Sequence, residues 1–319
     1  MSAHVIRGML ESMTHTRLHS TTPIPPAPSP RADVSHSPQP AQGTTATACA
    51  AAPVVLQAQN VTKSFGETVA LRGVSVAIRA GESVAVMGPS GSGKTTLMHV
   101  LSGIVSADSG ETWFNGQAGH SGRLGQGRVA LSTLTEDQRA ELRRQSIGFV
   151  FQEGLLLPEL TARENVAVAL MISGVPRRSA EAEADQWLAR LGLAGMEERR
   201  PAQLSGGQAQ RVAIARAQVT QPSVVFADEP TGALDSVTSQ QVLSALHEST
   251  ISRGAPLVTV THDETVASRC SRLIRLQDGG VVYDSAEASE PERVPGAAPG
   301  AAQEASSQTW HAGSPGAGA

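Results

Sequence analysis

Two kinds of hydrophobic pattern follow one another along the chain, and they predict strands first and then alternating strands and helices. Short segments rich in Val, Ile and Phe and bounded by Gly, Pro or Asn have the composition of β-strands. A turn at Gly81 divides the second of these segments, and Asn115-Gly116 and Asp278-Gly279 are dipeptides typical of hairpin turns. The later segments SVVFADE and PLVTVTHD are continuously apolar, as in buried parallel strands. Strands are expected at 54–65, 73–89, 111–117, 147–152, 223–229, 256–263 and 272–284.

Apolar residues recur every three to four positions in the segments between the later strands, which predicts amphipathic helices. Two of these segments open with a capping box, Thr135 with Gln138 and Thr161 with Glu164. Helices are expected at 93–104, 135–145, 161–174, 179–193 and 207–219.

The order of these elements predicts an α/β domain at 53–285, with a mixed sheet as its core and an antiparallel β subdomain made of the early strands. The stretch from about 153 to 204 has almost purely helical signals, so it is expected to be a helical subdomain inserted into that core. The flanking segments 1–52 and 286–319 are rich in Pro, Ser and Ala and show no periodicity. They are expected to be disordered tails.

Composition narrows the classes of function. The formal charge of −4 argues against a general nucleic-acid-binding protein, so no nucleic-acid partner is expected. Two cysteines, one of them in an expected tail, do not support a disulfide framework and favour a reducing cytoplasm. There is no run of about 18 apolar residues and no basic-then-apolar leader. The chain is therefore expected to be soluble and to reach a membrane only through a partner.

The segment GPSGSGKTT fits the G-x-x-x-x-G-K-[ST] pattern of a phosphate-binding loop, and it lies between an apolar strand and a helix. Its glycines let backbone N–H groups converge on phosphate oxygens at the positive end of the helix dipole. Lys94 would reach the β- and γ-phosphates, and the Thr95 hydroxyl would hold Mg²⁺. The alternative is a chance Gly/Ser-rich turn, which does not explain the strand before it or the helix after it. The fold is therefore expected to be a P-loop NTPase with ATP and Mg²⁺ as cofactors. The residues expected to bind the nucleotide are Gly88, Pro89, Ser90, Gly91, Ser92, Gly93, Lys94, Thr95 and Thr96.

A pair of carboxylates, Asp228 and Glu229, ends the buried strand at 223–227. A carboxylate at such a position is costly unless it has a partner. Asp228 is expected to pair with Mg²⁺ through water, and Glu229 to act as the general base that polarises the attacking water. The alternative is that the pair caps the turn PTGALD that follows.

A second Gly-rich turn, LSGGQ at 204–208, opens the helix that follows it. Ser205 is expected to be the N-cap, and Gly206 and Gly207 would expose backbone N–H groups at the positive helix end. Taken alone, this turn is a common way to begin a helix.

The same turn resembles the signature of the ATP-binding-cassette (ABC) family. The resemblance extends over about 54–284 and includes, in order, the phosphate loop, Gln152 after an apolar strand, the signature, the acidic pair, ALD at 233–235, and His262 after the last core strand. The family implies an ATPase made of two cassettes packed head to tail. The signature turn of one chain closes on the ATP held by the phosphate loop of the other. The residues implied in this contact are Ser205, Gly206, Gly207 and Gln208.

The resemblance implies further roles. Phe65 matches the aromatic that stacks on adenine, with a core aromatic as the alternative. Gln152 would touch Mg²⁺ or the attacking water, and His262 would contact the γ-phosphate, so both join Glu229 as catalytic residues. Asp235 would bridge the dimer interface or, alternatively, only cap a helix. The family often has Ser where this chain has Gly232, a departure in the first half of that loop.

Within the family, FADEPTGALDSVTS and IGFVFQEGLLLPELTARENVAVALMISG are most similar to the lipoprotein-release and macrolide-export branch (LolD- and MacB-like). That branch implies a separate FtsX-like membrane permease and a peripheral location on the cytoplasmic face of the cell membrane. The permease contacts would be Leu155, Leu156, Leu157 and Pro158, unless these residues pack within the helical subdomain.

The expected function is therefore the ATP-hydrolysing subunit of a transporter for export or lipoprotein release, paired with a second copy or a paralogous cassette. One alternative is a soluble ABC ATPase that acts on a partner such as the ribosome, but that class carries two cassettes in one chain. Another is a regulatory cassette without turnover, but Glu229 and His262 are both present.

Overall fold

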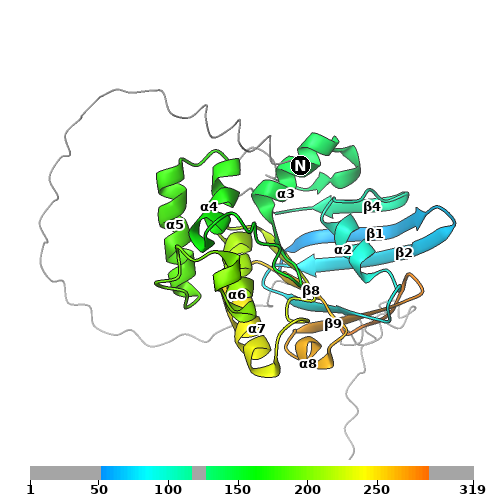
Figure 1. Cartoon of the computed structure of the whole chain (residues 1–319). Helices are drawn as coiled ribbons and strands as arrows, with labels where there is room; N and C mark the ends of the chain where they lie inside the picture. Colours follow the sequence, from blue (N-terminus) through cyan, green and yellow to red (C-terminus); the bar gives the residue numbers. More distant parts are fainter. Residues whose placement is uncertain (1–51, 117–126, 287–319) are drawn as a thin grey trace, which may run out of the picture. The chain divides into compact units, whose positions relative to one another are not determined.

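The computed structural model describes residues 52–116 and 127–286, which form two β-sheets with helices around them (Figure 1). The two predicted tails lie almost wholly outside the described residues, as does the segment 117–126 that follows the expected turn at Asn115-Gly116. The strands are β1 (Val54–Phe65), β2 (Thr68–Arg79), β3 (Ser83–Met87), β4 (Ser109–Phe114), β5 (Val129–Ala130), β6 (Ile147–Val150), β7 (Val224–Asp228), β8 (Leu257–Val260), β9 (Arg272–Gln277) and β10 (Gly280–Asp284). The helices are α2 (Lys94–Leu101), η1 (Leu131–Thr133), α3 (Glu136–Ser146), α4 (Ala162–Ile172), α5 (Arg177–Arg190), η2 (Pro201–Gln203), α6 (Gly206–Gln218), α7 (Ser236–Ile251) and α8 (Glu264–Ala267).

The early strands form a four-stranded antiparallel sheet in the order β2-β1-β4-β5. β1 and β2 are 12 residues each, and they pair from Phe65 opposite Thr68 to Val54 opposite Arg79. On its other side β1 pairs with β4, with Leu56 opposite Phe114. The predicted antiparallel β subdomain is confirmed.

The later strands form a six-stranded sheet in the order β10-β9-β3-β8-β7-β6. Its inner strands are parallel, and every residue of β3 and β8 is buried, which explains why both read as continuous apolar runs. β10 is antiparallel to β9, across a turn in which Asp278 and Gly279 have positive φ angles of 49° and 80°. This is the predicted hairpin, and it makes the core sheet mixed, as expected.

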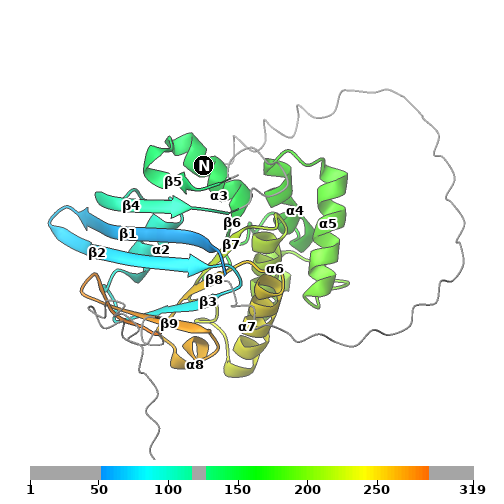
Figure 2. The ribbon, with the colours of Figure 1, turned by 180° about the vertical axis from the view of Figure 1, so that it is seen from behind.

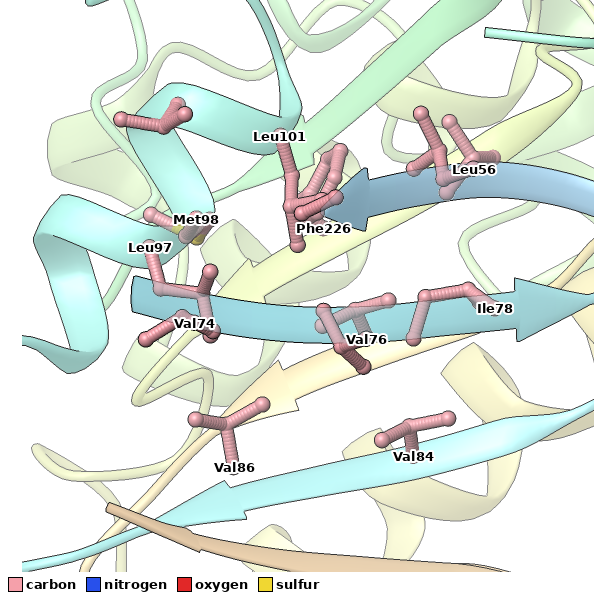
Figure 3. Close-up of a cluster of buried hydrophobic side chains, with 14 of the residues drawn as sticks. Leu56, Val74, Val76, Ile78, Val84, Val86, Leu97, Met98, Leu101 and Phe226 are labelled. Atoms are coloured by element: carbon pink, nitrogen blue, oxygen red, sulfur yellow. The ribbon is translucent and has the colours of Figure 1, made fainter. Parts of the chain in front are cut away.

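Helix α2 packs in the space between the two sheets. Its Leu97, Met98 and Leu101 lie toward side chains of β2 and β7, among them Val74 and Phe226 (Figure 3). These side chains are all almost completely buried. The helix that follows the phosphate loop is therefore fixed by a core that both sheets share.

A second apolar cluster joins the helices α4 to α7 to the edge of the central sheet formed by β6 and β7. α4 and α5 lie side by side, on the same side of the central sheet's strands as α6 and α7 and away from the antiparallel sheet (Figures 1 and 2). The capping boxes of α3 and α4 form as predicted, with Thr135 Oγ1 accepting from the Gln138 N–H and Thr161 Oγ1 from the Glu164 N–H. α5 begins at Arg177, two residues before the expected start, directly after Pro176.

Candidate functional site

Four loops leave the central sheet at one edge, and they carry most of the predicted site residues. β3, β8, β7 and β6 are parallel neighbours, with Val86 opposite Val260, Asp228 opposite Val260, and Val150 opposite Ala227. The carboxyl ends of parallel strands lie at the same edge, which is where ligands bind in open α/β sheets. The sheet therefore places the phosphate loop, His262, the acidic pair and Gln152 along one edge.

The phosphate loop runs from the end of β3 to the first turn of α2. Gly93 is the N-cap of α2 with a φ of 97°, and a Cβ built there would lie 2.4 Å from the Ala70 carbonyl oxygen, so only glycine fits. No side chain caps this helix, which leaves the N–H groups of its first turn to face an anion. Lys94 Nζ donates to the carbonyl oxygens of Gly88 at 2.9 Å and Pro89 at 2.8 Å. The Lys94 side chain thus folds back over the phosphate loop.

Asp228 ends β7 and is half-buried. Burial, and then the neighbouring charge of Glu229, raise the pKa of Asp228, while the charges of His99 and Lys94 oppose the shift. Burial also lowers the pKa of His99, against the charge of Asp228. Two residues of α2 thus lie close enough to act on the charge of Asp228, and a cation bound beside this carboxylate would relieve its buried charge.

Glu229 and His262 are in direct contact. Glu229 Oε1 lies 2.8 Å from His262 Nδ1, and the imidazole is 70% exposed while the carboxylate is 28% exposed. The Glu229 backbone has a φ of 44°, in the left-handed region, and its N–H donates to the Val260 carbonyl at 2.9 Å. This strained backbone turns the side chain toward the loop after β8, as strain at functional sites often does. The turn-cap alternative holds only for the main chain, since the Gly232 N–H donates to the Glu229 carbonyl.

Gln152 follows β6 and packs against the loop after β7. A Cβ built on Gly232 would lie 2.9 Å from Gln152 Nε2, so the glycine makes room for this side chain. The backbone around Gln152 is held by α6: Gln210 Nε2 donates to the Phe151 carbonyl at 2.8 Å. Arg216, also on α6, donates to the carbonyl oxygens of Gly154 at 2.6 Å and Leu155 at 2.8 Å. The segment that carries Gln152 is thus tied to the signature helix.

The signature turn opens α6, as predicted, with Ser205 as the N-cap. Ser205 Oγ accepts from the Gln208 N–H, and Gln208 Oε1 accepts from the Ser205 N–H, which is a full capping box. Ser205 and Gly206 are exposed, whereas Gly207 is buried against α7. α6 and α2 lie well apart in both ribbon views (Figures 1 and 2). The chain therefore does not fold its own signature turn onto its own phosphate loop.

Phe65 lies at the end of β1 and is 53% exposed, so it is not a core aromatic. Asp235 is the N-cap of α7, accepting from the N–H groups of Val237 and Thr238, which bears out the capping alternative and leaves the interface role a prediction. Within the candidate permease surface, Leu155 and Leu157 are exposed, and Leu156 packs against the helical core.

One residue near this edge, His99, was not predicted from the sequence. The charge of Asp228 acts on His99, yet no motif in the sequence marks this histidine, because it lies inside an ordinary apolar helix. Its spacing of four from Thr95 was the available signal, since residues four apart share a helix face.

Comparison with known proteins supplies the family. A sequence model described as ABC transporter matches residues 71–232. The chain is 41% identical over 232 residues to the lipoprotein-releasing system ATP-binding protein LolD of Legionella pneumophila, covering 72% of this chain and 97% of that protein. The chain belongs to the ABC transporter family. It is an ATP-binding cassette with the ATP-hydrolysing activity of that family.

Two further relatives set the limits of the comparison. The chain is 42% identical over 246 residues to the macrolide export ATP-binding/permease protein MacB of Marinobacter nauticus, covering 76% of this chain but 36% of that protein. The chain thus spans about a third of the MacB relative's length. It also resembles the solved dimer of an ATP-binding cassette in a post-hydrolysis state with ADP and Pi, with 36% identity, a TM-score of 0.62, and coverage of 72% of this chain and 97% of that one. No helix in 52–116 or 127–286 is long and apolar enough to cross a bilayer.

Proposed function

We propose that this cassette pairs with a second copy of itself around two ATP molecules and drives a separate FtsX-like membrane permease, for export or lipoprotein release. The observation that carries the pairing is the separation within one chain of the exposed signature turn from the phosphate loop. A two-fold arrangement would place each signature turn on the partner's loop. The LolD relative, named as an ATP-binding protein of a lipoprotein-releasing system, supports the permease partner and hence a location on the cytoplasmic face of the membrane.

In this proposal different residues at the sheet edge bind the phosphates and activate the attacking water. Lys94 and the N–H groups at the start of α2 would neutralise the phosphates. Glu229 would take a proton from the attacking water, and its contact with His262 would hold the carboxylate in place. Since Nδ1 of His262 faces Glu229, Nε2 is the atom left to reach the γ-phosphate.

Mg²⁺ fits the donors at this edge. Within the described residues there is no group of three or more His, Cys, Asp or Glu side chains that could hold a metal by themselves. Asp228, Thr95 and Gln152 offer a carboxylate, a hydroxyl and an amide oxygen, and Mg²⁺ is usually bound through one or two carboxylates together with substrate phosphates. When bound, it would neutralise the charge that develops on the phosphates.

A subunit-mixing experiment tests whether the ATP site is shared. Lys94→Ala removes the loop cation, and Ser205→Arg blocks the signature turn, so each variant alone should neither dimerise with ATP nor hydrolyse it. A mixed dimer would contain one site with both defects and one intact site. Light scattering should therefore show ATP-dependent dimers only in the mixture, with up to about half of wild-type activity, because one of the two sites in each mixed dimer is intact. A mixture that stays monomeric and inactive would contradict the shared site.

A second experiment tests the partner. Tagged Glu229→Gln chain, which should bind ATP but hardly turn it over, is incubated with ATP and gently solubilised native membranes. Co-purification of one multi-spanning protein at matching stoichiometry is expected. Recovery of ribosomes instead would support the soluble alternative and overturn the permease partner. Lys94→Ala is the matched control, because it should lose the ATP-dependent part of the capture.

A further inference from the structure

Lys63 is one of only two lysines among the 25 Lys and Arg residues of the chain, and the other is Lys94 of the phosphate loop. It lies on β1 two positions before Phe65, so the two side chains project from the same face of the strand. Lys63 Nζ lies over the Phe65 ring, 5.4 Å from its centroid. This is the geometry of a cation–π contact.

Asp108 holds the ammonium at that place. Lys63 Nζ donates to Asp108 Oδ1 at 2.7 Å, and the Ser64 N–H donates to Asp108 Oδ2 at 2.7 Å. The Asp108 N–H in turn donates to the Thr62 carbonyl, which fixes the aspartate beside the end of β1. The Lys63 side chain is only 15% exposed as a result, while Phe65 stays 53% exposed. One face of the ring is thus covered by a positioned cation and the rest is open.

We propose that Lys63 is a positioning residue for the nucleotide base: its ammonium, anchored by Asp108, fixes the Phe65 ring and leaves one face for adenine. This inference rests on the proposed function, which gives Phe65 the adenine contact. An exposed phenylalanine at a strand end has free rotamers, and ordering it on binding costs entropy that a pre-placed ring does not. A lysine can fill this position because its ammonium has three donors on a flexible stem, so it can bind a carboxylate while it lies over a ring.

Two other roles for Lys63 predict different results. Its charge could act directly on the phosphates, in which case Phe65 is irrelevant to its effect. Alternatively, the Lys63–Asp108 pair could only join β1 to the segment before β4, in which case stability changes and nucleotide affinity does not. The test therefore needs a variant that removes the ring as well as one that removes the charge.

The experiment is a double-mutant cycle on ATP binding, with Lys63→Met, Phe65→Leu and the double variant, and Lys63→Arg as the charge-conserving control. Lys63→Met is expected to weaken ATP binding about 2- to 5-fold. The loss should appear in KM rather than kcat, and Lys63→Arg should restore part of it. In the Phe65→Leu background, Lys63→Met should have no further effect. Inorganic tripolyphosphate, which has no base, should bind wild type and Lys63→Met equally.

Each contrary outcome has a distinct meaning. If Phe65→Leu leaves ATP affinity unchanged, Phe65 does not bind adenine, and both that role and the positioning role of Lys63 are overturned. If Phe65→Leu weakens ATP but Lys63→Met does not, only the inference is overturned. If Lys63→Met weakens tripolyphosphate as well, or weakens ATP in the Phe65→Leu background, the charge acts on the phosphates and the inference is again overturned.

A spectroscopic measurement checks the contact itself. Reductive ¹³C-methylation keeps the lysine charge and labels just two side chains in this chain, Lys63 and Lys94. The Lys63 methyl signal should be displaced by the ring current of Phe65, and the displacement should vanish in Phe65→Leu. An undisplaced signal in the folded wild-type chain would contradict the contact.

Discussion

Gly207→Ala tests whether packing between α6 and α7 sets the position of the signature turn. Gly207 is buried, and a Cβ built there would lie 2.2 Å from the Cγ2 methyl of Thr238 on α7. Atoms cannot approach that closely, so the start of α6 has to move away from α7. Overpacking of this kind costs about 1–3 kcal/mol, which for a domain of this size lowers Tm by about 2–12 °C. Because the displaced turn would no longer match a partner's ATP, activity should fall about 10- to 100-fold.

Thr238→Ser offers a matched compensation. It removes the Cγ2 methyl and keeps the hydroxyl, whose hydrogen bond helps to hold the pKa of Asp235 low. Thr238→Ser alone should be close to wild type, and in combination with Gly207→Ala it should restore most of the lost Tm and ATPase activity. Thermal unfolding followed by circular dichroism and steady-state ATP hydrolysis measure both. A Gly207→Ala chain with wild-type Tm, or one that Thr238→Ser does not rescue, would refute the packing argument.

Three further outcomes are expected from buried groups. Arg272→Met should lower the free energy of unfolding, measured by urea titration, by about 3–5 kcal/mol, because the buried carboxylate of Asp284 loses its bidentate partner. A loss below about 1 kcal/mol would contradict this. Burial raises the pKa of Asp284, but the hydrogen bonds and charge of Arg272 lower that pKa by more. The contribution of Asp284 to the free energy of unfolding should therefore be fully present above the unfolded pKa of about 4, and it should be lost as the pH falls through the folded pKa. Asp284→Asn should flatten this pH dependence. Burial raises the pKa of Cys270 to about 11, so in a Cys49→Ser chain iodoacetamide at pH 8 should react about 100-fold more slowly than with a free thiol, and equally fast once the chain is unfolded.

Most of the fold could be predicted because local patterns and tertiary packing agree. Strand β1 has its predicted bounds, and the hairpin at Asp278-Gly279 forms where the turn chemistry places it. The start of α5 was placed two residues late because the charged Arg177 and Arg178 mask the helical period there. The division of the strands into two separate sheets was harder to predict, because the sequence of a strand does not determine which other strand it pairs with.

Motifs that carry their own chemistry, the phosphate loop and the acidic pair, predicted candidate site residues that the structure places along one edge of the central sheet. Contacts that join distant segments were not predicted: the pairing of Glu229 with His262 needs the parallel register of β7 and β8. The same holds for Lys63 and Asp108, which are 45 residues apart. For Phe65 the sequence left two interpretations open, an aromatic that stacks on adenine and a core aromatic. Its exposure in the structure rules out the core aromatic.

The ties between α6 and the segment after β6 bear on how a cassette of this kind could pass force to a permease. Arg216 donates to the carbonyls of Gly154 and Leu155, and burial lowers the pKa of this arginine; among the described residues it has no carboxylate partner. The exposed Leu155, 56% accessible, is therefore held by the helix whose first turn is the signature. Closure of that turn on a partner's ATP would carry Leu155 with it, so the surface proposed for the permease and the surface proposed for the nucleotide would move as one piece.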